Sequence, residues 1–344
     1  MALGKLVIYK SISGSACYNV FTNERKESNP DMNLLRIMKA IYRRLRLVWR
    51  NWIERIAGTP DVADYWTRHN VTQHQSFASR EESLDYLEWR NSRYLNYVEL
   101  MPLKGHDGKV MLDYGCGPGH DLVGFVEYSK PKKVYGLEVS SSSLAEAEKR
   151  LELHGATGLV ETRLIPEGNN PLPFPDATFD YIHSSGVLHH VTDLNAVMKE
   201  LGRVLKPDGV MRIMVYNYES LFLHLHVAYN LQITQKIDSG RPLLDAFRRS
   251  TDGWQCPISH CYKHREFEGL VNSCGFKGGF IGAAISLLEM SLLPIRFQAI
   301  DDRRLSVEHR DFLRSLTFDA HGYPLIDGAV AGIDAVYEFR KQGG

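Results

Sequence analysis

The stretch VMLDYGCGPGHD, residues 110–121, places a short apolar run directly before a glycine-rich turn. The apolar run has the composition of a buried strand, and the glycines permit a tight turn with close backbone approach to a ligand. A helix is predicted from about Asp121, and its first N–H groups would face the turn. The spacing G-x-G-x-G differs from the G-x-G-x-x-G of dinucleotide folds, and no Gly-Lys-Ser/Thr follows, so neither standard phosphate-binding motif is present.

Strand-like and helix-like patterns alternate from Lys109 onward. The predicted strands are KVMLDYG, KVYGLEVS, FDYIHSSG and GVMRIMVYN, with helical patterns between them. Such alternation is typical of a doubly wound, mostly parallel α/β sheet. Glu138 ends the second strand, where a carboxylate can accept hydrogen bonds from both ribose hydroxyls of a nucleotide. Together with the glycine turn, Glu138 favours a ribose-bearing ligand at the strand ends.

Four successive segments carry a family resemblance: LDYGCGPGHD, VYGLEVS, PLPFPDATFDYIHSSGVLHHV and LNAVMKELGRVLKPDGVMRIMV. In this order they resemble the motifs of class I S-adenosylmethionine-dependent methyltransferases, over about Lys109 to Tyr218. The resemblance implies an enzyme with a mostly parallel, seven-stranded sheet whose final strand is antiparallel. It also implies S-adenosyl-L-methionine as the cofactor.

The resemblance further implies roles for particular residues. Asp113 and the backbone of Gly115, Cys116, Gly117 and Gly119 would surround the methionine portion of the donor. Glu138 would hold the ribose and Val139 would lie beside the adenine, while Ser184 and Ser185 would line the place where donor and acceptor meet. Many relatives read the adenine amino group with an acidic residue, but Glu167 is one place out of register, so Asn169 or Asn170 could serve instead.

His189 and His190 are the histidines nearest in sequence to this reaction centre. Either could be the general base for a hydroxyl acceptor, or either could simply pack or hydrogen-bond. The Asn/Asp-Pro-Pro-Tyr/Phe signature of amide and exocyclic amine acceptors is absent here, and O-methylation is expected. Methyl transfer needs no metal. We predict no metal site, because the C-x-x-x-H-C-x-x-H spacing at residues 256–264 matches no paired zinc pattern.

The acceptor is expected to bind outside the shared block, in two aperiodic segments rich in aromatic, histidine and hydroxyl groups, residues 65–77 and 250–267. The candidates are Tyr65, Trp66, His69, His74, Trp254, His260 and Tyr262. The second segment loosely resembles bacterial methyltransferases of small-molecule and cell-surface glycan pathways, which favours a small-molecule or saccharide acceptor. A lipid-linked or macromolecular acceptor, and a non-catalytic scaffold that binds the donor, are the alternatives.

Five regions are predicted: a loosely ordered leader (1–32), an amino-terminal helical region (33–104), the donor-binding core (105–218), an inserted helical and loop cap (219–264) and the carboxy-terminal part of the core sheet (265–344). Residues 33–57 predict an amphipathic helix with a basic face. This helix could cover the core, pair with a second copy in a homo-oligomer, or lie on an anionic membrane surface.

Composition narrows the partners and the compartment. The formal net charge is zero, so no nucleic acid is expected. Five scattered cysteines and an amino-terminal apolar run interrupted by lysine suggest a cytoplasmic protein with reduced thiols. Residues 278–297 are largely apolar, but Glu289 and Pro294 favour a buried strand followed by a helix over a membrane span.

Overall fold

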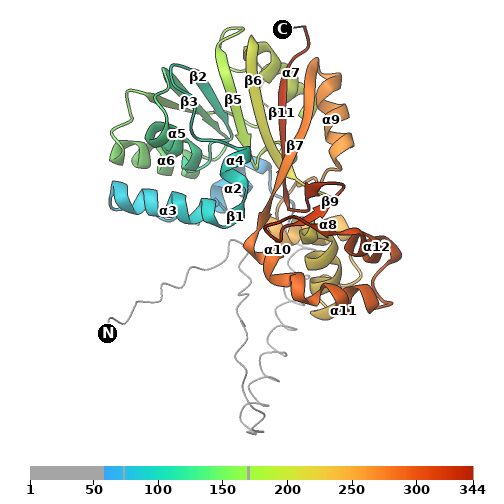
Figure 1. Cartoon of the computed structure of the whole chain (residues 1–344). Helices are drawn as coiled ribbons and strands as arrows, with labels where there is room; N and C mark the ends of the chain where they lie inside the picture. Colours follow the sequence, from blue (N-terminus) through green and yellow to red (C-terminus); the bar gives the residue numbers. More distant parts are fainter. Residues whose placement is uncertain (1–57, 73, 169–170, 344) are drawn as a thin grey trace.

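The computed structural model describes residues 58–72, 74–168 and 171–343. An eight-stranded sheet organises this part of the chain, in the order β1-β7-β11-β6-β5-β2-β3-β4 (Figure 1). Strands β2 to β6 pair in parallel, and β11 runs antiparallel between β6 and β7. The strands are β1 Tyr94–Leu95, β2 Val110–Tyr114, β3 Lys133–Glu138, β4 Val160–Leu164, β5 Phe179–Ser185, β6 Leu205–Tyr216, β7 Phe276–Ser286 and β11 Asp334–Lys341.

The predicted mostly parallel α/β sheet with an antiparallel final strand is confirmed, with one strand more than the seven predicted. The additional strand, β1, lies within residues 33–104, the amino-terminal region that the sequence pattern predicted to be helical. Asn96 adopts φ +68°, a left-handed conformation that asparagine tolerates, and this ends any continuous helix. Residues 80–100 therefore form helix α3 (Arg80–Ser92), β1 and the short helix α4 (Tyr97–Leu100).

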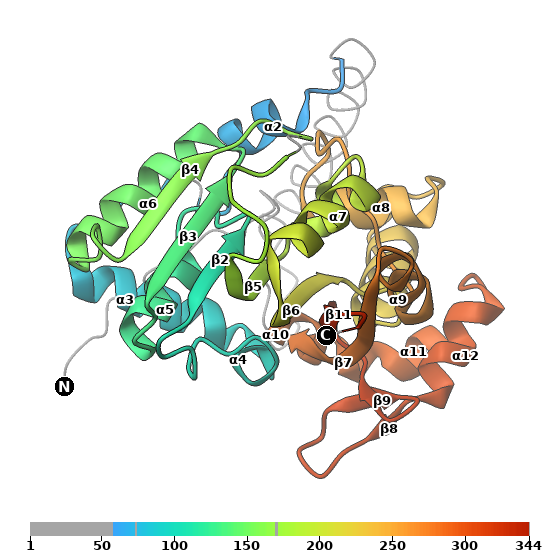
Figure 2. The ribbon, with the colours of Figure 1, turned by 90° about the horizontal axis from the view of Figure 1, so that it is seen from above.

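Helices cover both faces of the sheet, as Figure 2 shows. On one face, α3, α5 (His120–Tyr128) and α6 (Ser141–Leu153) bury apolar side chains such as Leu87, Phe125 and Leu151. On the other face, α7 (Leu194–Val204) and α9 (His264–Ser273) bury Leu201 and Phe267. The remaining helix before the sheet, α2 (Val62–Arg68), lies near the carboxyl ends of the parallel strands, where ligands bind in doubly wound folds.

A second lobe lies beyond the same end of the sheet (Figure 1). Its two apolar clusters join the helix after β6 to the carboxy-terminal helices. Residues 287–330, which the sequence assigned to the core sheet, pack in this lobe together with the predicted cap, because their apolar faces meet that helix. The elements are η2 Phe222–Thr234, α8 Leu243–Thr251, α10 Leu287–Leu292, η3 Leu293–Ile295, α11 Arg296–Asp301, α12 Val307–Ser315, β8 Thr317–Phe318, β9 Pro324–Ile326 and β10 Ala329–Val330.

Within the described residues, none of the helices combines the length and apolar character needed to cross a bilayer. Residues 278–297 form most of β7, then α10, η3 and the first turn of α11, which agrees with the predicted strand followed by a helix. The amphipathic segment 33–57 lies outside the described residues, and its membrane, core-covering or subunit-pairing role stays a prediction.

Two buried histidines connect η2 to α12. The Nδ1 atoms of His224 and His309 are 2.8 Å apart, so one ring donates and the other accepts. Burial, together with the charge of nearby His309, lowers the pKa of His224 to about 3. Protonation of both rings would break this hydrogen bond and place two positive charges together.

We expect the second lobe to lose stability as the pH falls from about 6.5 towards 3, because the unfolded chain binds a proton that folded His224 does not. The loss should be about 2 kcal/mol at pH 5. Hydrogen exchange of peptides from η2 and α12 should be faster at pH 5 than at pH 7. His224→Asn should remove most of this difference, and an unchanged pH dependence in that variant would contradict the assignment to His224.

Candidate donor and acceptor site

The glycine turn after β2 leaves space for a ligand at one position. Gly115, Gly117 and Gly119 have φ values of +79°, +52° and +79°, which disfavour other residues. A Cβ on Gly115 would lie 2.3 Å from Val187 Cγ2, and one on Gly119 would lie 3.0 Å from Ala147 Cβ. A Cβ on Gly117 would meet none of the described atoms within 4 Å. Gly115 and Gly119 thus permit close packing, whereas Gly117 faces open space.

Glu138 ties the turn to the end of β3. Its Oε2 accepts the Gly117 N–H at 2.8 Å, and its Oε1 accepts the N–H groups of Val139 at 3.0 Å and Ser140 at 2.8 Å. Burial raises the pKa of Glu138, while these three N–H groups oppose the rise. Two carboxylate oxygens offer about four acceptor sites in all, so the side chain can still receive a ligand hydroxyl.

Asp113, the fourth residue of β2, is a buried carboxyl without a hydrogen-bond donor among the described residues. Burial raises its pKa to about 7, and the nearby charge of His183 opposes this. A buried carboxylate without a partner is costly, so a ligand that brings a positive charge would stabilise it. The site therefore fits a ligand with a ribose at Glu138 and an ammonium at Asp113.

The other residues predicted to bind the donor differ in their burial and contacts. The Cys116 thiol is buried beside Gly136, and its backbone N–H donates to the Leu137 carbonyl at 2.9 Å, so only its backbone is available to shape the turn. Val139 is half-buried beside Glu138, as the adenine assignment requires. Asn169 and Asn170 lie outside the described residues.

The two serines that end β5 have different surroundings. Ser184 is fully buried, and its hydroxyl donates to the Tyr114 carbonyl at 3.0 Å, so it braces β5 against β2. Ser185 is half-buried, and its Oγ lies 2.6 Å from the Tyr97 hydroxyl. Of the two, only the Ser185 hydroxyl contacts the polar groups on the α3–α4 side of the sheet.

Sequence reasoning missed a buried ionic network beside Ser185. Arg90 Nη1 donates to Asp121 Oδ1 at 2.6 Å, and His183 Nε2 lies 3.1 Å from Asp121 Oδ2. Arg90 also donates to the Tyr97 hydroxyl at 3.1 Å. Burial by itself would raise the pKa of Asp121, but the Arg90 guanidinium and His183 hold it well below its usual range. Asp121 directly follows the glycine turn, which was the available signal; Arg90 and Tyr97 carried none.

The predicted general bases, His189 and His190, form a short 3-10 helix, η1 (Leu188–His190), after β5. His189 is fully buried, and neither of its ring nitrogens has a hydrogen-bond partner among the described residues. Burial lowers its pKa well below the usual value, and its ring packs 3.9 Å from that of Tyr216. These contacts favour a packing role for His189.

His190 has polar contacts on both ring nitrogens. Its Nδ1 lies 2.6 Å from the Ile258 carbonyl, which can only accept, so Nδ1 carries the proton. Its Nε2 lies 3.6 Å from Asp252 Oδ1, which also accepts the Tyr216 hydroxyl at 2.7 Å. This geometry leaves a lone pair on Nε2 and a carboxylate nearby that would stabilise a proton there.

Helix α2 brings the first group of predicted acceptor residues to the site. The Ser140 hydroxyl donates to the Trp66 carbonyl at 3.2 Å, and the Trp66 ring lies 4.9 Å from that of His190. Tyr65 is buried, and its hydroxyl donates to the Asp252 carbonyl. Helix α2 thus spans from the end of β3 to η1. His69 and His74 are exposed, and His69 stacks on Tyr65 while His74 lies 3.4 Å from Glu146, so neither contacts η1.

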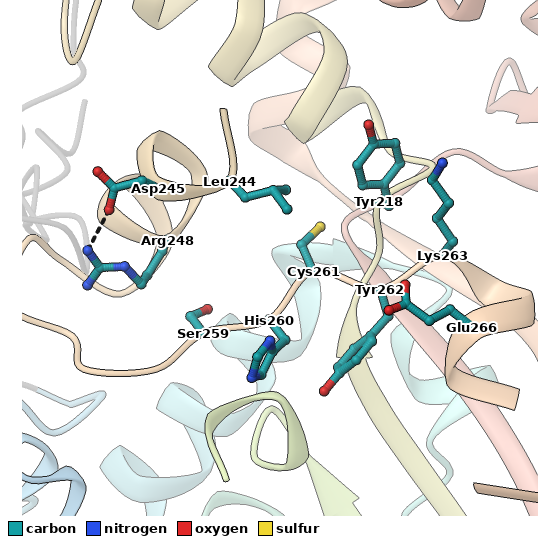
Figure 3. Close-up of a pocket in the computed structure, with 10 residues that line it drawn as sticks. All are labelled: Tyr218, Leu244, Asp245, Arg248, Ser259, His260, Cys261, Tyr262, Lys263 and Glu266. Carbon is teal, nitrogen blue, oxygen red and sulfur yellow. Dashed lines mark hydrogen bonds and ion pairs between the residues drawn. The ribbon is translucent and has the colours of Figure 1, made fainter. Parts of the chain in front are cut away.

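The second predicted group lies beside a pocket of about 520 Å³ between α8 and α9 (Figure 3). The His260 N–H donates to the His189 carbonyl at 2.9 Å, and Tyr262 pairs with the end of β6 through Tyr216. Trp254 is half-buried in the turn after Asp252 and does not line this pocket. The lining residues are Tyr218, Leu244, Asp245, Arg248, Ser259, His260, Cys261, Tyr262, Lys263 and Glu266.

One group of potential metal ligands occurs among the described residues, and it differs from the Cys/His set considered from the sequence. Atoms of His190, Asp252 and Cys256 lie within 4.8 Å of one another. His190 Nδ1 and the Cys256 thiol both face the Ile258 carbonyl, and Asp252 accepts the Tyr216 hydroxyl. These hydrogen bonds account for the arrangement without an ion, so the absence of a metal requirement stays a prediction.

Fold and site together fit a nucleoside ligand at the strand ends, and comparison with known proteins shows what this domain is similar to. A family model described as a methyltransferase domain matches residues 105–252. The demethylmenaquinone methyltransferase of Geobacillus stearothermophilus is 34% identical over 140 residues, covering 40% of this chain and 55% of that protein. An uncharacterized methyltransferase of Schizosaccharomyces pombe is 37% identical over 130 residues, covering 35% of this chain and 44% of that protein.

Among solved structures, a geranyl diphosphate C-methyltransferase from Streptomyces coelicolor, in complex with S-adenosyl-L-homocysteine, aligns with a TM-score of 0.45 and 16% identity, covering 76% of this chain and 83% of that chain. The present chain spans about half the length of the curated relatives it matches. Residues 105–252 thus match a methyltransferase domain, the class of enzyme that the sequence motifs predict, and the cofactor predicted for it is S-adenosylmethionine.

Proposed function

We propose that this protein transfers a methyl group from S-adenosylmethionine to a hydroxyl of a small molecule or saccharide. The observation that carries the proposal is the presence of two buried carboxyl groups at the same edge of the sheet: Glu138, which accepts the Gly117 N–H, and Asp113, which receives no hydrogen bond from the described residues. Glu138 would accept the ribose hydroxyls and Asp113 would neutralise the ammonium of the donor. When bound, S-adenosylmethionine supplies an electrophilic methyl group on a sulfonium.

The residues around the donor would orient the acceptor and exclude water. Helix α2 lies against the β3 end and η1, so it would cover the donor and limit access of solvent. The pocket in Figure 3 supports a polyhydroxylated acceptor, because the rings of Tyr218 and Tyr262 lie among charged and hydrogen-bonding side chains. Its net charge is balanced, with Asp245 and Glu266 offsetting Arg248 and Lys263.

The test of this proposal begins with titration calorimetry of the whole protein against S-adenosylmethionine and, separately, NAD. We expect binding of S-adenosylmethionine alone. Transfer of a labelled methyl group is then measured with phenols, catechols and hexoses, and with demethylmenaquinone because one relative carries that name. Binding of NAD, or of neither ligand, would refute the donor assignment; donor binding without any methyl transfer would favour a scaffold.

His190 is the residue that we propose as general base. Its Nε2 would take the proton of the acceptor hydroxyl, and Asp252 would stabilise the charged ring. We expect His190→Gln to lower kcat by about 100-fold, the lower end of what a general base contributes. Affinity for S-adenosylmethionine should be unchanged. The matched control is His321→Gln, an exposed histidine outside the pocket and the site, which should retain at least half of the wild-type kcat; equal rates in both variants would exclude His190 as the base.

A further inference from the structure

The carboxyl group of Asp334 receives no hydrogen bond from the residues that the structure describes. Asp334 is the first residue of β11, its exposed fraction is 4%, and none of the described residues donates a hydrogen bond to its side chain. Buried carboxyl groups are nearly always paired, because loss of hydration is costly without compensating hydrogen bonds. A partner beyond the described residues, such as a bound ligand, would remove this cost.

Strand register places Asp334 on the face of the sheet that carries the reaction centre. Asp334 pairs with Tyr216 on β6, and Met214, two residues before Tyr216, pairs with Ser185. Register partners and residues two apart project from the same face, so these four side chains share it. The Tyr216 ring lies 6.0 Å from that of His190, which brings the proposed base to the same edge.

Tyr94 stands on the same face and also lacks a partner. It pairs with Ser286 on β7, two residues from Ala284, which pairs with Asp334. Tyr94 is half-buried, and its hydroxyl forms no hydrogen bond with any described residue. Burial raises the pKa of Tyr94, and the charge of Asp334 raises it further, so the two groups are within electrostatic reach of each other.

The charged and titratable groups around Asp334 favour its neutral form. Burial raises the pKa of Asp334 to about 8, Glu289 contributes in the same direction, and Arg90 opposes. The negative charge of ionised Asp334 would also raise the pKa of three tyrosines, Tyr94, Tyr97 and Tyr216. A neutral carboxyl both donates and accepts a hydrogen bond, which matches a hydroxyl; an ammonium would require the ionised form.

We propose that Asp334 and Tyr94 bind a hydroxyl group of the acceptor and thereby orient the acceptor beside Ser185 and His190. This inference rests on the proposed function, because it assigns a further contact of the same acceptor, outside the residues that line the pocket in Figure 3. It also limits the acceptor class to molecules with a hydroxyl that can enter a buried position between β1 and β6.

The first test needs no acceptor. Asp334→Asn removes the ionisable group at little change in shape, and we expect the ligand-free variant to melt above wild type at pH 8, by about 2 °C or more. The difference should be smaller at pH 5: with a raised pKa, Asp334 contributes stability at low pH that is lost as pH rises towards 8. Glu289→Gln is the matched control, a buried carboxyl that accepts the Phe222 N–H at 3.0 Å and the Ser286 N–H at 2.8 Å.

Glu289→Gln should lower Tm, because buried N–H groups lose an acceptor. If Asp334→Asn also lowers Tm at pH 8, Asp334 has a structural partner and the proposal is overturned. A lower Tm in both variants would overturn the proposal whether or not the donor assignment is correct, because this comparison involves no ligand.

The second test measures binding by calorimetry with S-adenosyl-L-homocysteine saturating, using catechol, glucose and their methyl ethers as probes. Asp334→Asn and Tyr94→Phe should each weaken binding of the hydroxyl probes at least tenfold relative to their ethers, with S-adenosyl-L-homocysteine affinity unchanged. Hydroxyl binding equal to wild type would overturn the assignment of Asp334 and Tyr94 alone. Failure of wild type to bind S-adenosyl-L-homocysteine would instead refute the proposed function.

Discussion

Glu138→Ala should weaken binding of S-adenosylmethionine by about 100- to 1000-fold. The carboxylate is the proposed acceptor for both ribose hydroxyls, and hydrogen bonds to a charged group contribute about 1.5–3 kcal/mol each. Loss of both would cost at least about 3 kcal/mol, the lower end of the summed contributions, which corresponds to a loss of affinity of more than about 100-fold. Titration calorimetry of wild type and variant with the same ligand measures the difference directly.

The Glu138 substitution needs a control for loop structure. The carboxylate also accepts N–H groups from Gly117, Val139 and Ser140, so alanine would release the turn as well as the ribose. Glu138→Gln keeps one acceptor oxygen and most of the shape, and it should bind the donor about tenfold more weakly than wild type. An unchanged affinity in the alanine variant would refute the ribose assignment; equal losses in both variants would attribute the effect to charge rather than to the loop.

The candidate donor residues could be predicted from the sequence because they lie in short segments at the ends of neighbouring strands. Gly115, Gly117 and Glu138 lie at the ends of two strands with clear apolar patterns, and parallel pairing brings these ends together. The tight turn also requires glycine at specific positions, which leaves a visible spacing. The antiparallel final strand, β11, followed from the family resemblance, and the structure confirms it.

The acceptor half could not be predicted in the same way, since its groups come from distant segments. Asp334 and Tyr94 are 240 residues apart in sequence and approach only through the pairing of β7 with β1 and β11. Asp252 reaches His190 through an irregular turn after α8. No periodic pattern marks such residues, and only the fold shows which partners they have. The same holds for residues 287–330, whose apolar faces suit a core or a second lobe equally well.

Asp121→Asn should destabilise the protein by about 3–5 kcal/mol, because it leaves the buried Arg90 guanidinium without its counter-charge. Arg90 and Asp121 are joined at 2.6 Å, with side-chain exposures of 23% and 7%. A loss of this size corresponds to a decrease in Tm of about 4–7 °C for a protein of this length. The network links α3 to α5, so the covering of the donor-binding face should loosen together with the loss of stability.

Asp311→Asn is the matched control, since Asp311 pairs with Arg314 on the surface of α12 with exposures of 61% and 49%. An exposed pair contributes about 0–1 kcal/mol, so this variant should melt within about 2 °C of wild type. The pH dependence supplies a second criterion. The pKa of folded Asp121 is depressed, so its contribution is complete above about pH 4 and is lost as the pH falls. If Asp121→Asn melts like Asp311→Asn at pH 7, the buried network contributes no net stability and α3 is held by its apolar contacts alone.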